Sequence, residues 1–151
     1  MDKKEKKIID NTVSELLELL GIEGTFEIKD NEEGIDIVLD TKDSGLVIGY
    51  HGDTLESLQL VISLCIAKRL DKFVRVSIEV GDYKKNRTEW LRNLALTTKE
   101  RVIGENKEIA LPQLKSWERR IVHLLLKDDR DVVSQSQGEG RDRTLVVSPK
   151  Q

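Results

Sequence analysis

The feature that most constrains the fold of this chain is a pair of glycines, Gly49 and Gly52, that ends one apolar run and precedes a long apolar-periodic segment. Glycine permits positive φ, and it lets the backbone lie against a flat partner because no Cβ intervenes. The pattern predicts a turn that leads into the N-terminus of a helix, whose first amides lack intrahelical acceptors and suit phosphate oxygens. The same spacing is also typical of a plain turn between two helices.

Periodicity on both sides of this turn predicts the other elements of the first half of the chain. Helical spacing of apolar residues before Gly21, and alternation of apolar and polar residues further on, distinguish helices from strands. The predicted elements are a helix over 5–20, a hairpin of strands 25–29 and 35–39, a short helical turn, a helix from Asp53 to about Arg69, and a strand over 73–80. Their order is α-β-β-α-α-β.

The helix predicted after the glycine pair is apolar over more than one face. One stripe at helical spacing comprises Leu55, Leu58, Ile62, Cys65 and Ile66. A second set, Leu60, Val61 and Leu64, widens the stripe beyond what one sheet would cover. The width predicts a second buried contact, either with the C-terminal half or with another chain. We interpret the single cysteine of the chain, within this helix, as a buried small hydrophobic residue, and no intramolecular disulfide is possible.

The segment Ile48-Gly49-Tyr50-His51-Gly52, with its flanking elements, resembles the nucleotide-binding loop of KH domains, which grips the backbone of about four nucleotides. The order α-β-β-α-α-β is that of type II KH domains. The resemblance implies that Gly49, Tyr50, His51 and Gly52 contact nucleic acid. A basic residue usually stands between these glycines, whereas this chain has Tyr50, which offers a ring for base stacking, and His51.

The second half of the chain predicts another small unit after Gly81-Asp82. Its predicted elements are a helix from about Tyr83 to Ile103 closed by Gly104, a short strand over 107–111, a helix over 116–127, and strands over 132–137 and 144–148 joined by a glycine-bearing hairpin connection. We therefore expect an α+β protein with two domains, 1–81 and 82–151, the second with helices packed on a small three-stranded sheet.

Charge is distributed unevenly between these two domains. The whole chain has a formal net charge of -3. Residues 1–81 carry 10 Lys and Arg against 17 Asp and Glu, whereas residues 82–151 carry 15 against 11 and contain eight of the ten arginines. If a polyanion binds, the second domain is expected to supply most of the attraction.

The helix predicted over 116–127 carries Arg119 and His123 four residues apart, hence on one face. Taking about 100° per residue from Ile121, the helical wheel groups Trp117, Leu124 and Leu125 on one side and puts Arg119 and His123 nearly opposite. Arg120 lies about a quarter-turn round toward the core edge. The wheel predicts an exposed Arg119 whose removal hardly changes stability, and an incidental Arg/His pair on a solvated face is the alternative interpretation.

These residues carry a second resemblance. Arg119-x-x-x-His123 follows Leu111-Pro112 and Trp117-Glu118 and precedes Gly138-Glu139-Gly140-Arg141. This pattern resembles the domain family named for an arginine and a histidine with three residues between them (RxxxH). With the KH-like half, essentially residues 1–150 resemble the bacterial Jag family, also called SpoIIIJ-associated protein, in which many members carry a further small N-terminal domain that we do not expect here.

The resemblance implies a single-strand nucleic-acid-binding protein, with RNA the first expectation and DNA the alternative. The binding residues that it implies in the second domain are Arg119, Arg120, His123, Lys127, Arg141 and Arg143. A rival interpretation is a protein-interaction adaptor, in which the acidic KH half pairs with another KH protein, with a second copy of the chain or with a membrane-insertion component.

Other function classes find little support in the sequence. Two distant histidines and one cysteine form no zinc motif, and no phosphate-binding P-loop motif is present, so we expect no enzyme and no cofactor. No apolar run approaches the roughly 20 residues needed to span a bilayer, and the N-terminus lacks the apolar core of a signal peptide. We therefore expect a cytoplasmic protein that does not span the membrane.

Overall fold

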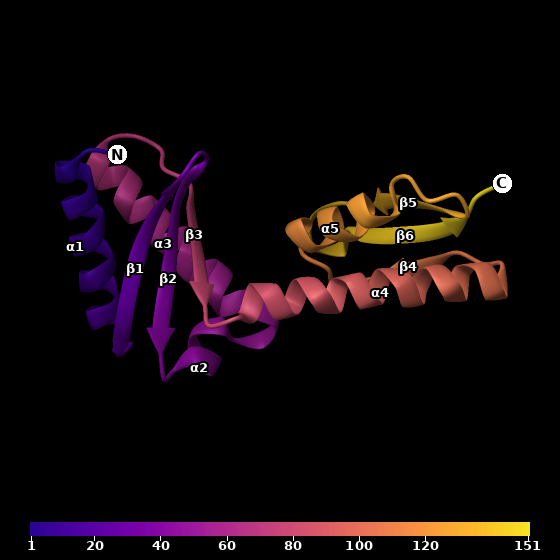
Figure 1. Cartoon of the computed structure of the whole chain (residues 1–151), viewed down its shortest axis with the longest axis horizontal. Coiled ribbons are helices and arrows are strands. Elements are labelled where there is room, and N and C mark those ends of the chain that lie inside the picture. The colour runs from indigo at the N-terminus through magenta and orange to yellow at the C-terminus, as the bar shows by residue number, and fades with distance from the viewer. The chain divides into compact units, whose positions relative to one another are not determined.

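The computed structural model describes residues 1–151, which divide into two compact units, Met1–Lys84 (unit 1) and Lys85–Gln151 (unit 2). Figure 1 shows that each unit combines helices with a small sheet. The elements of unit 1 are α1 (Lys3–Leu19), β1 (Gly24–Asn31), β2 (Gly34–Thr41), α2 (Ser44–Ile48), the 3₁₀ turn η1 (Tyr50–Gly52), α3 (Asp53–Leu70) and β3 (Val76–Val80). The predicted α-β-β-α-α-β order is confirmed.

The sheet of unit 1 has the strand order β1-β2-β3. The hairpin strands β1 and β2 are antiparallel, and β3 returns parallel to β2 with Val76 opposite Ile35. Alternate residues of the central strand, Ile35, Ile37 and Leu39, are buried against α1 and α3. Both helices therefore cover the same face of the sheet, and the turn between α2 and α3 projects from this core (Figure 1).

The first helix shows how local chemistry sets the ends of an element. The Asp2 side chain accepts a hydrogen bond from the Glu5 amide, and the Glu5 carboxylate accepts one from the Asp2 amide, which is a capping box. At the other end Gly21 has φ +68°, and the amides of Gly21 and Ile22 donate to the carbonyls of Glu18 and Leu17. This Schellman arrangement uses glycine as the predicted stop.

Two details of unit 1 differ from the sequence-based expectation. The strand predicted over 73–80 begins only at Val76, and Phe73 is 82% exposed. The second apolar set on α3 is exposed as well, with Leu60 and Leu64 at 60% and Val61 at 46%. The sheet and α1 cover only the first stripe, and the predicted second contact of α3, with the C-terminal half or with another chain, stays a prediction. The lone Cys65 is partly rather than fully buried.

Unit 2 packs two helices on a second sheet. Its elements are α4 (Tyr83–Glu105, whose first two residues belong to unit 1), β4 (Ile109–Leu111), α5 (Ser116–Leu126), β5 (Val132–Gln137), the 3₁₀ turn η2 (Gly140–Asp142) and β6 (Thr144–Pro149). The strand order is β4-β6-β5, with both pairs antiparallel. The core joins Leu91 and Val102 of α4 to Val122 of α5 and Leu145 of β6. The predicted α+β class with two small domains is confirmed.

The end of α4 corrects one prediction. Gly104 lies inside the helix, which continues to Glu105, and Asn106 takes the left-handed conformation at φ +49°. Asparagine is the residue besides glycine that most readily adopts this conformation, so it can end a helix in the same way.

Lys84 joins the beginning of α4 to the open face of the first sheet. Its amide donates to Glu79 Oε1 at 3.0 Å and its ammonium donates to Ser77 Oγ at 2.6 Å. Burial lowers the pKa of Lys84, while the carboxylates of Glu79 and Asp36 oppose the shift.

None of the helices is both long enough and apolar enough to cross a membrane.

Candidate nucleic-acid interface

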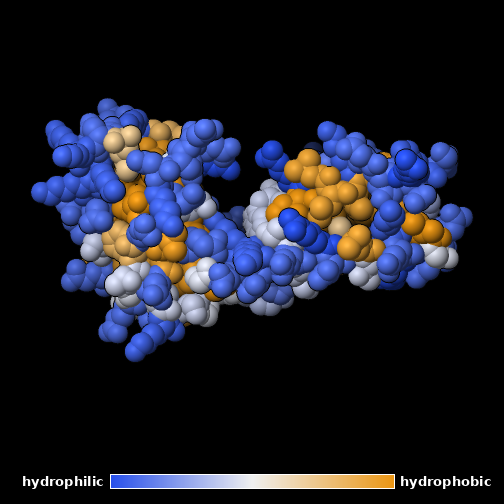
Figure 2. All heavy atoms as spheres, in the orientation of Figure 1, coloured by the Kyte–Doolittle hydropathy of each residue, from blue (hydrophilic) through white to orange (hydrophobic).

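The buried face of α5 is not the one that the helical wheel predicted. Glu118, Val122 and Leu126 are buried, whereas Leu124 and Leu125 are 55% and 47% exposed. The Glu118 carboxylate is paired inside unit 2, and the core face is rotated toward Glu118, Val122 and Leu126. Figure 2 shows hydrophobic side chains gathered on the surface of unit 2 over α5.

This rotation changes the positions of the two neighbouring arginines. Arg119 is half-buried beside the core face, where its guanidinium donates to the Leu114 carbonyl at 2.6 Å and to Ser116 Oγ at 3.2 Å. Arg120 is exposed on the outer face of the helix. The prediction that Arg120, rather than Arg119, lies nearer the core is therefore wrong.

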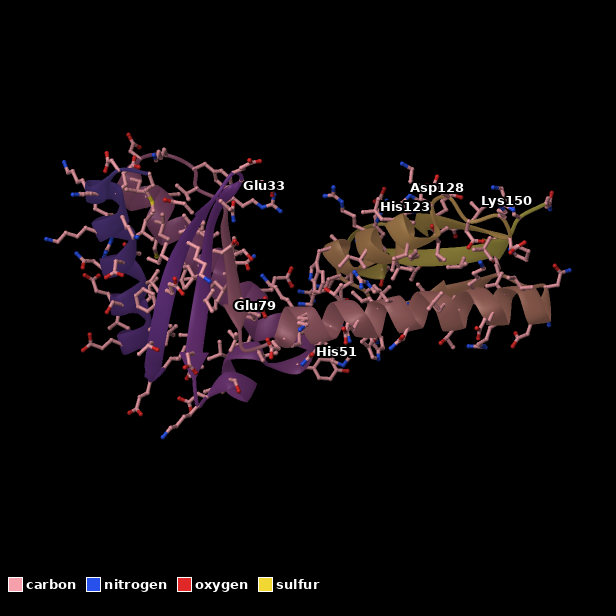
Figure 3. All side chains as sticks on the ribbon, viewed as in Figure 1. Glu33, His51, Glu79, His123, Asp128 and Lys150 are labelled. Carbon is pink, nitrogen blue, oxygen red and sulfur yellow. The ribbon has the colours of Figure 1, made fainter.

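His123 combines an exposed ring with a fixed orientation. Its Nδ1 lies 2.7 Å from Oγ of Ser134, a side chain of β5 that is only 7% exposed. One ring nitrogen is thus occupied by the sheet, and the rest of the ring is open to solvent. Figure 3 shows His123 on α5 and His51, the other histidine, in the turn before α3 of unit 1.

Three basic side chains follow one line along α5. Arg119, His123 and Lys127 are spaced four residues apart, which places them one above another on the helix surface, and the exposed Arg120 flanks this line. Lys127 is exposed at the C-terminal end of the helix. We call the four residues Arg119, Arg120, His123 and Lys127 the basic face of α5.

Arg141 and Arg143, both exposed, lie on the connection between β5 and β6. The Arg143 guanidinium donates to the Gly138 carbonyl at 3.1 Å, so a hydrogen bond joins the two ends of the connection. Because β5 follows α5 after a short link and contacts it at Ser134, the connection lies toward the end of unit 2 where α5 begins (Figure 1). The structure thus brings the connection toward the Arg119 end of the basic face.

An ion pair that the sequence analysis missed supports this end of α5. Arg87 Nε of α4 lies 2.6 Å from Glu118 Oε1, and the two side chains are 13% and 1% exposed. The second carboxylate oxygen, Glu118 Oε2, accepts the Lys115 amide at 3.0 Å. A Glu three residues after the residue that precedes a helix is a signature of a helix start, and this signal could have singled out Glu118.

A second charged contact joins α4 to the link between α5 and β5. The Lys99 ammonium donates to Asp129 Oδ2, and Asp129 Oδ1 accepts the amides of Asp131 and Val132. The hydrogen bond from Lys99, together with those backbone donors, lowers the pKa of Asp129, and the same bond raises the pKa of Lys99. The link that precedes β5 is held to α4 by this contact.

In unit 1 the predicted loop has the conformation that its glycines allow. Gly49 and Gly52 have φ +69° and +79°, and His51 is also left-handed at φ +50°. A Cβ on Gly49 would lie 2.1 Å from Thr54 Oγ1, and one on Gly52 would lie 2.8 Å from the Tyr83 hydroxyl oxygen. Both glycines are therefore required by the packing of the turn as well as by its dihedral angles.

The two residues between the glycines form a small aromatic platform. The rings of Tyr50 and His51 stack with centroids 4.1 Å apart, and Tyr50 is 73% exposed. The residue that precedes α3 is Gly52, which has no side chain to cap the helix. The four loop residues are thus together in unit 1, whereas the basic face and the β5–β6 connection belong to unit 2.

The structure contains no group of three or more His, Cys, Asp or Glu side chains suited to hold a metal ion.

A KH-type α-β-β-α-α-β unit followed by an α+β unit with an Arg-x-x-x-His helix defines a class of two-domain proteins. Residues 6–79 match the KhpA/KhpB KH domain family, and residues 89–149 match the family of the Arg-x-x-x-His (RxxxH) domain. The chain belongs to the KhpB family. The expected combination of a KH domain with an RxxxH domain is confirmed, and the relatives found carry the name KhpB rather than Jag.

The relatives cover both units. The chain is 30% identical over 153 aligned positions to the RNA-binding protein KhpB of Clostridium symbiosum, covering 97% of this chain and 69% of that protein. It is 30% identical over 135 positions to KhpB of Streptococcus pneumoniae serotype 2, covering 89% of this chain and 41% of that protein. It is 31% identical over 109 positions to KhpB of Bacillus subtilis, covering 71% of this chain and 52% of that protein. Some relatives are therefore about twice as long as this chain.

Proposed function

We propose that this chain binds single-stranded RNA without performing a chemical step, and that unit 2 supplies most of the electrostatic attraction. The observation that carries the proposal is the basic face of α5, where Arg119, His123 and Lys127 form a line flanked by Arg120. Arg141 and Arg143 extend the positive charge at one end. Support also comes from the relatives, which are named RNA-binding proteins.

The parts of this face differ in the contacts they suit. Arg120 and Lys127 are exposed, and their long charged side chains suit contacts with phosphates along a strand. The ring of His123, oriented by Ser134, presents its free edge as a hydrogen-bonding or stacking surface. In unit 1 the Tyr50–His51 platform offers one aromatic face to a base beside the N-terminus of α3.

The proposal is tested by measuring affinity for unstructured RNA as a function of salt. If about four phosphates are neutralised, log K falls with log salt at a slope of about -3, taking roughly 0.7 per phosphate for single strands. A matched single-stranded DNA and a blunt RNA duplex complete the set. A flat salt dependence, or equal affinity for the duplex, would contradict the proposal, whereas equal affinity for the DNA would widen it to both nucleic acids.

A second candidate function is pairing with another KH domain through α1 and α3. The exposed leucines Leu60 and Leu64 leave an apolar strip on α3. Beside it a shallow groove between the two helices is lined by Leu16 and Leu19 of α1, and by Leu64 and Cys65 of α3. An acidic first domain with an apolar strip suits protein contact better than phosphate contact.

Light scattering on the chain alone and mixed with a separate KH protein tests this pairing. Leu60→Glu should abolish any dimer that forms, while the control Leu96→Glu, at an equally exposed position on α4, should not. Monomers in every mixture would remove this second function. Association with a membrane-insertion component remains an expectation from the Jag resemblance.

A further inference from the structure

Trp90 lies on α4 with about half of its surface, 47%, exposed to solvent. Tryptophan is highly buried on average, because its ring is the largest apolar side chain, so a half-exposed ring offers a large contact area to a flat partner. One side of the ring is occupied: the Arg87 guanidinium carbon lies 4.1 Å from the ring centroid. This is a cation–π contact, and it leaves the remainder of the ring accessible.

The stacked arginine is itself held in place. Arg87 Nε is bonded to the buried carboxylate of Glu118, which also accepts the Lys115 amide. Glu118 is 1% exposed, so this anchor is rigid. The Trp90 ring therefore rests on a guanidinium that cannot easily move, and a flat ligand on the free side of the ring would meet a pre-formed platform rather than a mobile side chain.

The platform adjoins the region assigned to phosphate binding. Its anchor, Glu118, lies in the first turn of α5, one residue before Arg119. The β5–β6 connection with its two exposed arginines lies toward the same end of unit 2. An aromatic ring beside positive side chains is the combination by which proteins hold single strands, since cations meet the backbone while bases stack on the ring.

We propose that Trp90, backed by Arg87, is a nucleobase-stacking site of unit 2, which binds one base of the single strand whose phosphates contact the basic face of α5. The inference rests on the proposed function and adds a base-binding site to it. Every base has a π-face, so the site accepts all four bases with little preference. It contributes affinity without adding a phosphate contact.

A purely structural role for Trp90 makes different predictions. The ring could serve only to shield the Arg87–Glu118 pair from water, in which case its replacement lowers stability and leaves RNA affinity unchanged. A base on the ring, by contrast, changes the tryptophan emission on binding. The chain has only one other tryptophan, Trp117, which packs against the core of unit 2.

The first measurement therefore follows fluorescence excited selectively in tryptophan in the Trp117→Phe protein, where Trp90 is the sole tryptophan. Titration with oligouridylate should quench the emission to saturation. An abasic oligonucleotide of the same length and charge should bind through its phosphates and leave the emission nearly unchanged. Equal quenching by both strands, or none by either while binding is seen by gel shift, would overturn the stacking site.

The second measurement compares affinities of Trp90 variants of the otherwise unaltered chain. Loss of one stacked base costs about 1–3 kcal/mol, which corresponds to about 5- to 150-fold, so Trp90→Leu should weaken binding to each homopolymer by that factor. Trp90→Tyr should restore most of the affinity. The salt slope should stay the same in both, and Leu96→Ala, a change at another exposed position of α4, should have no effect.

The outcomes separate the two proposals. If the parent chain fails to bind any single strand, the proposed function fails. If the parent binds with the expected salt slope while Trp90→Leu binds equally well, only the stacking site is removed. A Trp90→Leu protein with a lowered melting temperature and parental affinity would assign Trp90 to shielding the ion pair and would also overturn the inference.

Discussion

Arg119 and Arg120 are adjacent in the chain and differ in what holds them. The Arg119 guanidinium donates to the Leu114 carbonyl and to the Ser116 hydroxyl. These hydrogen bonds hold the segment that leads into α5 against the helix. Arg120 is exposed on the outer face of the helix. A charged group that is already bonded to the fold contributes to stability as well as to ligand attraction, whereas a solvated one contributes mainly to attraction.

Arg119→Ala and Arg120→Ala should therefore differ in stability more than in binding. We expect Arg119→Ala to lower the free energy of unfolding by about 1–2 kcal/mol, because a charge-assisted hydrogen bond to the Leu114 carbonyl is lost. Arg120→Ala should change it by less than about 0.5 kcal/mol and should reduce the salt slope of RNA binding by about 0.7. Denaturant unfolding and salt titration measure both, and equal stabilities would contradict the assignment.

His123 should give RNA binding a pH dependence. Near phosphates a positively charged imidazole gains attraction, so affinity should be higher at acid pH than at alkaline pH. The rise should be absent from His123→Ala. His51→Ala serves as the matched control, since His51 is the only other histidine. A pH dependence that survives in His123→Ala and disappears in His51→Ala would assign this effect to the loop of unit 1.

Ser134 adds a test of how His123 is positioned. Ser134→Ala removes the hydroxyl that lies 2.7 Å from His123 Nδ1 while it leaves the charge of the face unchanged. We expect weaker binding with an unaltered salt slope, because the ring loses its orientation and no phosphate contact is removed.

The helices α4 and α5 are joined by a buried charge pair in addition to apolar contacts. Removing one partner of such a pair leaves the other charge buried without a partner. This lowers the free energy of unfolding more than removing both partners does. Glu118 also caps the segment before α5 through the Lys115 amide, so the pair positions the end of the helix that carries Arg119.

We expect Glu118→Ala to destabilise the protein by about 3 kcal/mol or more, because Arg87 is left uncompensated at 13% exposure. The double change Glu118→Leu with Arg87→Leu should recover part of this loss. Urea unfolding of the parent, Glu118→Leu, Arg87→Leu and the double variant completes the cycle. Additive losses would show that the two side chains do not act as a pair.

The contact between Lys99 and Asp129 should make stability depend on pH in the acid range. The Lys99 hydrogen bond holds the pKa of Asp129 below its ordinary value of 3.8. A carboxyl with a depressed folded-state pKa stabilises the fold fully above its unfolded pKa, and that contribution is lost as the pH falls through the folded value. The loss should thus occur below about pH 4, and Asp129→Asn should remove this part of the acid dependence. Melting temperatures of the two proteins across that range measure the effect.

Over the whole chain, positive charge concentrates in the second half, with 15 Lys and Arg against 11 Asp and Glu over residues 82–151. The first half is acidic and has an uncharged Tyr50 beside His51 in the loop where KH domains usually carry a basic residue. Unit 2 is thus suited to the long-range attraction of nucleic acid. Unit 1 is suited to base contact or to protein pairing.

Paired substitutions should separate these contributions. Arg120→Ala with Lys127→Ala should weaken binding strongly at low salt and lower the salt slope by about 1.4. Tyr50→Ala with His51→Ala should leave the slope nearly unchanged and reduce affinity by the same factor at every salt concentration. If the second pair lowers the slope as much as the first, the loop of unit 1 would be a phosphate-binding site of equal weight.

Much of the architecture could be predicted from local patterns. The helix that ends at Gly21, the β1–β2 hairpin and the glycine turn before α3 all depend on residues within a few positions of one another. Local backbone preferences and the periodicity of apolar residues act over that range, so they are visible in a single sequence. The same holds for the spacing of Arg119 and His123 on one helix.

The orientation of that helix was decided by tertiary contacts. Glu118 looks like a surface residue until Arg87, 31 residues earlier in the chain, supplies a buried partner, and the core face of α5 rotates to include it. The orientation of the His123 ring likewise depends on Ser134 of another element. Burial depends on what packs against a residue, and for charged side chains a distant partner reverses the expectation that polarity alone supports.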